Sequence, residues 1–275
     1  MTPAILITGC STGIGRHCAL RLKHDGWQVF ATARKEADIE ALQREGLDAI
    51  YLDYAVTHSL EAALDKVLAR TGGRLDALFN NGAYGQPGAV EDLSIEVLRA
   101  QFEANFFGPH ELTRLVIPHM RKQGSGRIVH CSSILGLVPY RWRGAYNASK
   151  HALEGLMMTQ RMELAQSGIH VSLIEPGPIT SKFGDNALMY FHRNVDIAGS
   201  VHQEAYRHHL AKLEAGGGVN RFRLGPEAVY RKLQHALVSK HPRAQYAVTV
   251  PAIFISYIRS VAPQWLMDRL LLGND

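Results

Sequence analysis

The sequence has few cysteines and no long hydrophobic run. Its 275 residues include Cys10, Cys18 and Cys131, which are too few for a disulfide framework and lack the paired spacing of a zinc motif. We therefore expect reduced, mostly buried thiols. No apolar run reaches the ~18 residues of a membrane-spanning helix, and residues 4–8 are too short for the core of a signal peptide. A cytoplasmic protein that does not span a membrane is expected.

Concentrated positive charge is also lacking. Lys and Arg number 30 against 25 Asp and Glu, a net charge of +5, but no run of about five or six basic residues occurs. We therefore expect no nucleic-acid binding. Histidine is plentiful, but His202, His208 and His209 match no zinc spacing, so no metal site is predicted.

Short apolar segments alternate with segments of helical periodicity. Predicted strands cover 4–8, 27–33, 47–52, 75–80, 127–132, 169–175 and 245–250, and predicted helices cover 14–26, 36–45, 58–70, 95–122 and 145–167. The strands are apolar enough for burial on both faces, which predicts a doubly wound α/β fold with a parallel sheet. A chain of this length can bury one large core, so we expect a single domain over 1–275.

Two segments depart from this alternation. Residues 178–224 carry aromatic residues, histidines and three consecutive glycines; we favour a substrate lid over an inert excursion. Residues 253–272 are strongly apolar. Packing of this segment on the core or on a partner subunit is favoured, and peripheral contact with a membrane surface stays open.

A glycine-rich loop joins the first predicted strand to the first predicted helix. In such a context, backbone N–H groups and the helix dipole bind the pyrophosphate of a dinucleotide. A tight turn without a ligand is the alternative, but the strand, loop and helix together favour nucleotide binding. The expected binding residues in T-G-C-S-T-G-I-G are Gly9, Ser11, Thr12, Gly13, Ile14 and Gly15.

The stretch G-A-Y-N-A-S-K places Tyr146 four residues before Lys150. On a helix these side chains would lie one above the other on the same side. Chance spacing on a surface helix is the alternative. An adjacent ammonium favours the phenolate and would lower the pKa of the tyrosine from about 10 toward neutral pH, where it could exchange protons.

Together, T-G-x-x-x-G-x-G and Y-x-x-x-K resemble the short-chain dehydrogenase/reductase family over nearly the whole chain. The resemblance implies a Rossmann fold with strand order 3-2-1-4-5-6-7. It also implies a serine about a dozen residues before the tyrosine, for which Ser133 is preferred to Ser132. Asn105 matches the family asparagine that helps hold a water near the lysine; a helix-packing residue is the alternative.

The family mechanism would place a substrate carbonyl oxygen between Ser133 and Tyr146. Tyr146 would donate the proton, Ser133 would steady the oxyanion, and Lys150 would also hold the nicotinamide ribose. A cofactor-binding regulator or structural subunit without turnover is the alternative function, and the intact set of three residues argues against it.

The end of the second strand indicates the cofactor. An NAD-binding member of the family usually carries an acid where this chain has Ala33, and the following Arg34 could bind a 2′-phosphate in two-pronged fashion. A solvated arginine is the alternative. We expect NADP (NADPH) in preference to NAD. The other cofactor residues that the resemblance implies are Asp53 beside the adenine, Asn80 in an N-N-G-A segment that inverts the family's N-N-A-G, and Pro176, Gly177, Ile179 and Ser181, the last preferred to Thr180.

Within the family, the chain is similar to the branch of retinol dehydrogenases, 17β-hydroxysteroid dehydrogenases and bacterial aldehyde reductases. The apolar residues after Ser133 favour an apolar aldehyde, ketone or alcohol, such as an aliphatic aldehyde, a retinoid or a steroid. Arg141, Arg143 and Lys182 could serve an anionic substrate but are preferred as solvated rim residues or neighbours of the cofactor phosphate. A homo-oligomer, dimer or tetramer, is expected. The candidate lining residues are Tyr84, Leu135, Tyr140, Trp142, Phe183 and Met189.

Overall fold

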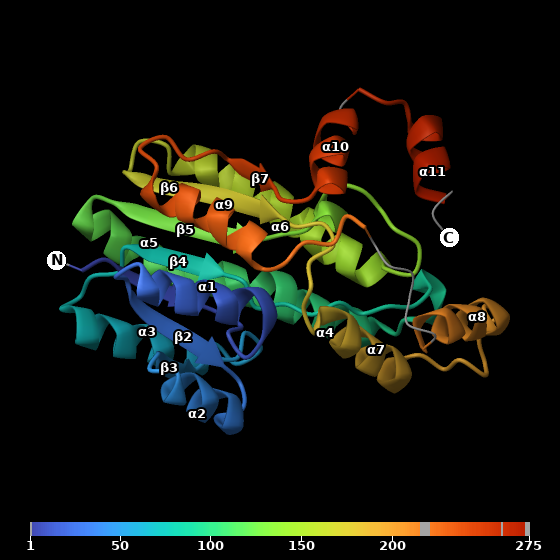
Figure 1. The fold of residues 1–275 in the computed structure, drawn as a ribbon, viewed down its shortest axis with the longest axis horizontal. Helices are drawn as coiled ribbons and strands as arrows, with labels where there is room; N and C mark the ends of the chain where they lie inside the picture. Colours follow the sequence, from blue (N-terminus) through green and yellow to red (C-terminus); the bar gives the residue numbers. More distant parts are fainter. Residues whose placement is uncertain (1, 215–220, 260, 273–275) are drawn as a thin grey trace.

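A seven-stranded parallel sheet with helices on both faces forms the centre of the molecule (Figure 1). The computed structural model describes residues 2–214, 221–259 and 261–272. The strand order is β3-β2-β1-β4-β5-β6-β7, which confirms the predicted topology. The strands are β1 (Ala4–Ile7), β2 (Gln28–Ala33), β3 (Asp48–Tyr51), β4 (Ala77–Asn80), β5 (Gly126–Cys131), β6 (Ile169–Glu175) and β7 (Gln245–Ala247).

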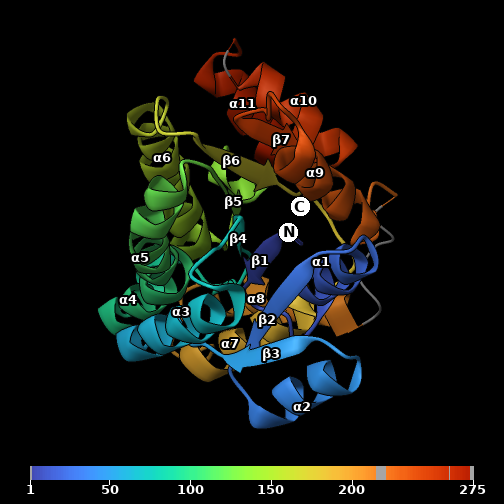
Figure 2. The same cartoon turned by 90° about the vertical axis from the view of Figure 1, so that its left-hand side faces the viewer.

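The helices divide between the two faces of the sheet (Figure 2). On one side α1 (Gly13–His24), α2 (Glu36–Arg44) and α9 (Glu227–Val238) pack over the first hydrophobic core. On the other side α3 (Thr57–Thr71), α5 (Gly108–Gln123) and α6 (Gly144–Glu163) pack over the second. Burial of both faces explains why the strand sequences are continuously apolar rather than alternating.

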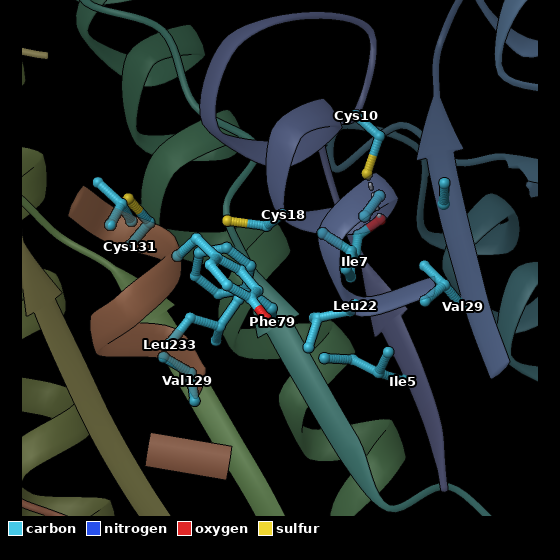
Figure 3. Packing of buried hydrophobic residues seen from close by; sticks show 14 of the residues in the cluster. Ile5, Ile7, Cys10, Cys18, Leu22, Val29, Phe79, Val129, Cys131 and Leu233 are labelled. Atoms are coloured by element: carbon cyan, nitrogen blue, oxygen red, sulfur yellow. Dashed lines mark hydrogen bonds between the residues drawn. The ribbon is translucent and has the colours of Figure 1, made fainter. Parts of the chain in front are cut away.

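The first core contains all three cysteines. Figure 3 shows Cys18 and Leu22 of α1 beside Phe79 of β4 and Leu233 of α9. Every cysteine is buried and free of disulfide bonds, as the sequence predicted. Burial raises the pKa of the Cys10 thiol to about 12, so these thiols act as small apolar core residues.

The long helical stretch expected at 95–122 is interrupted. It consists of α4 (Ile95–Phe102), a π-helical turn over Glu103–Phe107, and α5. A π turn inserts an extra residue and re-aims the side chains within it, and such turns are frequent at functional sites. Asn105 lies in this turn.

Two other boundaries differ from expectation. Helix α6 ends at Glu163 rather than near 167. The last strand ends at Ala247, not 250, because the Thr249 side chain accepts a hydrogen bond from the Ala252 N–H and so caps α10 (Val250–Ile258). Capping residues of this type favour a helix start over strand continuation.

Two helices occupy most of the predicted lid, α7 (Phe183–Asn194) and α8 (Gln203–Glu214). They enclose a small core of Phe191, Val195 and Tyr206 with Ala89 from the loop after β4. The three glycines at 216–218 lie outside the described residues.

The C-terminal apolar segment forms α10 and α11 (Gln264–Leu272), which lie beside the end of the sheet that carries β7 (Figure 1). Their inner residues, including Ile255 and Met267, pack against the segment that follows Ser133. Packing on the core is thus confirmed for one face. On the outer face, Phe254 and Tyr257 are exposed. No described helix is long and apolar enough to cross the bilayer.

Candidate active site

Helix α6 brings the predicted tyrosine and lysine together. Tyr146 is 7% exposed and Lys150 2% exposed. The Lys150 ammonium lies 5.8 Å from the centre of the Tyr146 ring and donates a 2.8 Å hydrogen bond to the Cys131 carbonyl at the end of β5. The one-turn spacing therefore places both groups at the carboxyl edge of the sheet, where ligands of open α/β sheets bind.

The environment of Tyr146 corrects one expectation. Burial raises the pKa of the phenol above its ordinary value, and a hydrogen bond with Ser133 and the charge of Arg143 offset this only in part. We expected Lys150 to lower this pKa toward neutral. Loss of solvent around the phenol outweighs nearby charge, because removal from water disfavours the phenolate.

The structure brings Ser133, rather than Ser132, to the phenol. Ser133 follows β5, and its hydroxyl accepts a 3.1 Å hydrogen bond from the Leu135 N–H at the start of a 3-10 turn over Ile134–Gly136. Ser132 instead continues the sheet, its N–H donating to the Ile174 carbonyl at 2.7 Å. Ser133 therefore has a hydroxyl fixed beside the proton-carrying group.

The Asn105 side chain connects three parts of the site. Its amide nitrogen donates to the Tyr84 carbonyl at 2.9 Å and to the Ser149 hydroxyl at 3.2 Å, and its amide oxygen accepts from the Tyr84 N–H at 3.2 Å. The π turn thus ties the loop after β4 to α6. These bonds match the packing role that the sequence left open.

The glycine loop is shaped to receive an anion. Gly9 and Gly13 have φ of +67° and +61°, which side chains rarely tolerate, and a Cβ at Gly15 would collide with the Gly9 carbonyl. Thr12 caps α1 without a side-chain hydrogen bond, and the first turn contains no acid. The N–H groups of that turn could therefore hold a phosphate.

The loop after β6 meets the glycine loop. A Cβ on Gly13 would come within 3.0 Å of the Ser181 Cβ. Pro176 accepts a 2.9 Å hydrogen bond from the Ile134 N–H. Ile179 forms a bridge with Leu224 that uses the neighbouring backbone groups of Pro178 and Thr180. The N–H and carbonyl of Ile179 itself therefore point away from Leu224.

Close packing at Gly177 and hydrogen bonds of Asn80 hold the bases of these loops. A Cβ at Gly177 would collide with the Thr249 hydroxyl. The buried Asn80 accepts a 2.7 Å hydrogen bond from the Tyr54 hydroxyl and donates a 2.9 Å bond to Thr113. Asn80 therefore supports the sheet edge from the core.

Asn81 was missed in the sequence. Its side chain donates to the carbonyls of Thr8 and Gly9 at 3.0 and 3.2 Å and so fixes the glycine loop. Its position directly after a buried strand and beside Asn80 was the available signal. The inverted N-N-G-A order has a local cause: a Cβ at Gly82 would come within 3.0 Å of the Tyr54 ring.

The end of β2 carries the alanine and the arginine on which the cofactor prediction rests. Ala33 is buried, whereas Arg34 is exposed and, within the described ranges, no acid lies at ion-pair distance from its guanidinium. Asp53 follows β3, and its carboxylate accepts a 3.1 Å hydrogen bond from the Ala55 N–H. Both side chains are at the same edge as the glycine loop.

The predicted lining residues do not all gather at the site. The Phe183 ring meets Tyr146 edge-on at 5.4 Å, and Tyr84 stacks on Tyr190 of α7 at 4.1 Å. Trp142, with an unusual φ of +62°, instead packs beneath α8 against Tyr206. The remaining candidates are Leu135, which is partly buried, and Tyr140 and Met189, which are exposed.

Arg143 differs from the expected solvated rim residue. It is the residue before α6 and is partly buried, and burial lowers the pKa of its guanidinium. Its charge acts on Tyr140 and Tyr146. Arg143 is therefore part of the phenol's surroundings, a role that its position three residues before Tyr146 could have signalled.

Metal ligation has no support in the described parts of the chain. No group of three or more histidine, cysteine or acidic side chains is placed to hold an ion there. The donors at the site are hydroxyls, an ammonium and backbone amides, which suit an organic anion rather than a transition metal.

Sequence comparison identifies relatives along the whole chain. Residues 3–188 match the family model described as short chain dehydrogenase. The uncharacterized oxidoreductase YbbO of Escherichia coli K12 is 41% identical over 99% of this chain and 95% of its own length. Human retinol dehydrogenase 8 is 36% identical over 65% of this chain and 60% of its own length.

Solved structures of related proteins have the same fold. A short-chain dehydrogenase from Streptomyces avermitilis is 30% identical with a TM-score of 0.78, covering 100% of this chain and 99% of that one. An actinorhodin polyketide ketoreductase with NADPH is 28% identical (TM-score 0.72; 90% and 95% covered). A short-chain dehydrogenase/reductase from Burkholderia phymatum with NAD is 23% identical (TM-score 0.79; 100% and 96% covered).

The crowding at Gly15 can be tested by substitution. Gly15→Ala should force the loop away from the Gly9 carbonyl, lowering both the melting temperature and the affinity for a nicotinamide nucleotide. Gly155→Ala on α6 is the control, because nothing lies within 4 Å of its added Cβ; it should stabilise the protein by about 0.5–1 kcal/mol. Thermal unfolding and nucleotide fluorescence titration measure both effects. Unchanged nucleotide affinity in Gly15→Ala would contradict this role of the loop.

Proposed function

Because the chain belongs to the short-chain dehydrogenase/reductase family and is an oxidoreductase, we propose that it uses NADPH to reduce an apolar aldehyde or ketone to the alcohol. The observation that carries the proposal is the buried set of Ser133, Tyr146 and Lys150 beside a loop shaped for a phosphate. The reverse oxidation would use the same groups.

Residues of the chain itself donate the proton to the substrate and stabilise the charge on its oxygen. Tyr146 gives its phenolic proton to the substrate oxygen, and the Ser133 hydroxyl donates a hydrogen bond to the same oxygen as negative charge develops there. The nicotinamide, when bound, supplies the hydride. Lys150 provides a fixed positive charge next to the phenol and holds the nicotinamide ribose.

The protonation state of the phenol affects reduction and oxidation differently. Because burial raises the pKa of Tyr146, the group stays protonated throughout the neutral range. A protonated phenol is the form that reduction needs, whereas oxidation of an alcohol needs the phenolate. At neutral pH the proton donor for reduction is therefore in place, whereas oxidation first requires loss of the phenolic proton.

The cofactor would lie along the carboxyl edge of the sheet. In this proposal the loop from Gly9 to Gly15 holds the pyrophosphate, Arg34 holds the 2′-phosphate, and Asp53 lies beside the adenine. The backbone of Ile179 contacts the carboxamide, and Ser181 lies over the glycine loop. Asn80 and Asn81 support these loops rather than touching the nucleotide.

The residues on the substrate side of the site favour an apolar substrate over a charged one. Phe183 covers the phenol edge, and the segment after Ser133 contributes Leu137 and Val138 to a small apolar core. We propose that 178–224 acts as the lid within a single domain and that the substrate is an aliphatic aldehyde, a retinoid or a steroid. A cytoplasmic homo-oligomer remains our expectation for the assembly.

Tyr146→Phe removes the transferable proton but keeps the ring. NADPH binding should survive, whereas kcat should fall by at least ~100-fold. Tyr257→Phe on the exposed face of α10 is the matched control and should leave kcat unchanged. Steady-state oxidation of NADPH and a fluorescence binding titration measure the two quantities. Near-normal turnover in Tyr146→Phe would remove the basis of this mechanism.

The two directions should differ in pH dependence. Between about pH 6 and 8, reduction should be nearly flat, because the phenol is already protonated below its raised pKa. Oxidation should rise by up to ~10-fold per pH unit, because the phenolate fraction grows by that factor. Both rates are measured on one aldehyde and alcohol pair. An oxidation rate that levels off near pH 7 would instead support a phenol pKa lowered by Lys150.

Arg34→Ala should weaken NADPH more than NADH, because only NADPH carries the 2′-phosphate. Loss of a charged hydrogen bond costs about 1.5–3 kcal/mol, or roughly 10- to 150-fold in affinity. Arg44→Ala removes the same charge from the exposed end of α2 and should affect both nucleotides little. Equal losses for NADPH and NADH in Arg34→Ala, or a wild-type preference for NADH, would refute the cofactor assignment.

Catalytic efficiency should rise with aldehyde chain length. Each buried methylene contributes up to about 0.8 kcal/mol, or about fourfold per carbon, until the pocket is full. The kcat/KM values of unbranched aldehydes with NADPH, beside matched carboxylate-bearing and sugar aldehydes, test this. A flat series, or preference for the charged compounds, would exclude an apolar pocket and implicate Arg143 in binding an anion.

A further inference from the structure

Two buried glutamates lie behind the proposed catalytic residues. Glu154 follows Lys150 by one turn of α6, and Glu175 is the last residue of β6; their exposed fractions are 7% and 1%. Leu173 faces the core beneath α6, and side chains two apart on a strand point to the same face. Glu175 therefore points toward the helix that carries Glu154.

The two carboxyl groups share one neighbour. The Gln245 amide donates a 3.2 Å hydrogen bond to one oxygen of Glu154, and the same side chain lies against Glu175. Gln245 pairs with Leu173 in the sheet register, which places its side chain on the face of Glu175. The three residues thus form a cluster built from β6, β7 and α6.

Two carboxyl oxygens in this cluster, Glu154 Oε1 and Glu175 Oε1, are buried without a hydrogen-bond partner among the residues that the structure describes. The buried Ser132 hydroxyl lies against Glu154 and can donate to only one of these oxygens. An orphaned buried polar atom typically costs about 1–3 kcal/mol, so such atoms are rare. A proton on one carboxyl supplies the second donor that the two carboxyl oxygens need.

The charges around the cluster favour one proton on the pair. Burial, and then the neighbouring Glu154, raise the pKa of Glu175 to about 8, and burial also raises the pKa of Glu154. Arg259 at the end of α10 and Lys150 act in the opposite sense. Two adjacent buried carboxyl groups cannot both ionise without a large penalty.

Lys150 needs a negative charge nearby. Burial lowers the pKa of its ammonium, and Glu154 is the carboxyl group that raises it. The other titratable groups close to Lys150 do not supply this charge: burial raises the pKa of the Cys131 thiol to about 11 and lowers that of His130 to about 3. Both are therefore neutral near pH 7, and a buried ammonium without a counter-ion loses its proton.

We propose that Glu154 and Glu175 share one proton, and that the single negative charge left on the pair is the counter-ion that keeps Lys150 protonated. The glutamates are positioning residues, since they act through Lys150. This role for Lys150 rests on the proposed function, whereas proton sharing does not. The two parts therefore need separate experiments.

Infrared spectroscopy of the nucleotide-free protein tests proton sharing without any substrate. With ¹³C-labelled glutamate, the wild type should show the carbonyl band of a protonated carboxyl group at pH 7, and the band should titrate away near pH 8. The band should be absent in Glu154→Gln/Glu175→Gln. No glutamic acid band at pH 7 in the wild type, or a band that persists in the double variant, would overturn proton sharing.

The pH profile of reduction tests the counter-ion. Each single Gln variant leaves one carboxyl group to carry the negative charge. The alkaline limb of that variant's pH profile should therefore stay close to that of the wild type. The double variant leaves none; the pKa of Lys150 should fall, and the alkaline limb should move to lower pH by at least about one unit, a tenfold change in proton affinity. Glu163→Gln at the exposed end of α6 is the control.

Two results would overturn the counter-ion role. One is a double variant whose pH profile matches that of the wild type. The other is a Glu154→Gln variant whose alkaline limb is shifted as far as that of the double variant, which would mean that Glu175 carries none of the negative charge. If no carbonyl compound is reduced by the wild type, the proposed function fails, but the infrared result still decides proton sharing.

Discussion

Removal of Tyr146 and Lys150 from water is the constraint on which the site depends. A phenol and an ammonium buried side by side need partners on every side, and those partners come from different elements: the Cys131 carbonyl on β5, the Ser133 hydroxyl beyond it, and the carboxyl pair of α6 and β6. The same burial keeps the phenol protonated. One physical condition therefore bears on both the geometry of the site and the protonation state of the phenol.

The shape of the glycine loop depends on close backbone contact. The Gly9 and Gly15 backbones meet where no side chain fits, and the Asn81 amide holds the carbonyls of Thr8 and Gly9. Tyr54 occupies the adjoining space and gives a reason for glycine at position 82, where the family motif has alanine. The inverted N-N-G-A order is thus compatible with the same loop, because glycine at position 82 leaves room for the Tyr54 ring.

The surroundings of the phenol are also in contact with the proposed lid. Arg143 and Trp142 precede α6, and the strained Trp142 packs beneath α8 of the proposed lid. Trp142 therefore joins α8 to the segment that places Arg143 near the phenol.

The sequence by itself determined whatever rests on local spacing. Apolar segments of strand length and helical periodicity predicted the parallel sheet, and the four-residue step from Tyr146 to Lys150 predicted their shared helix face, because both are properties of short stretches of backbone. The strand order came from the resemblance to the family. Only the tertiary structure decided the π turn at Asn105, the contact of Asn81 with the glycine loop, the raised pKa of Tyr146 and the meeting of Glu154 with Glu175. Each of these depends on which residues, distant in sequence, are brought into contact in the folded chain, and no local pattern records that.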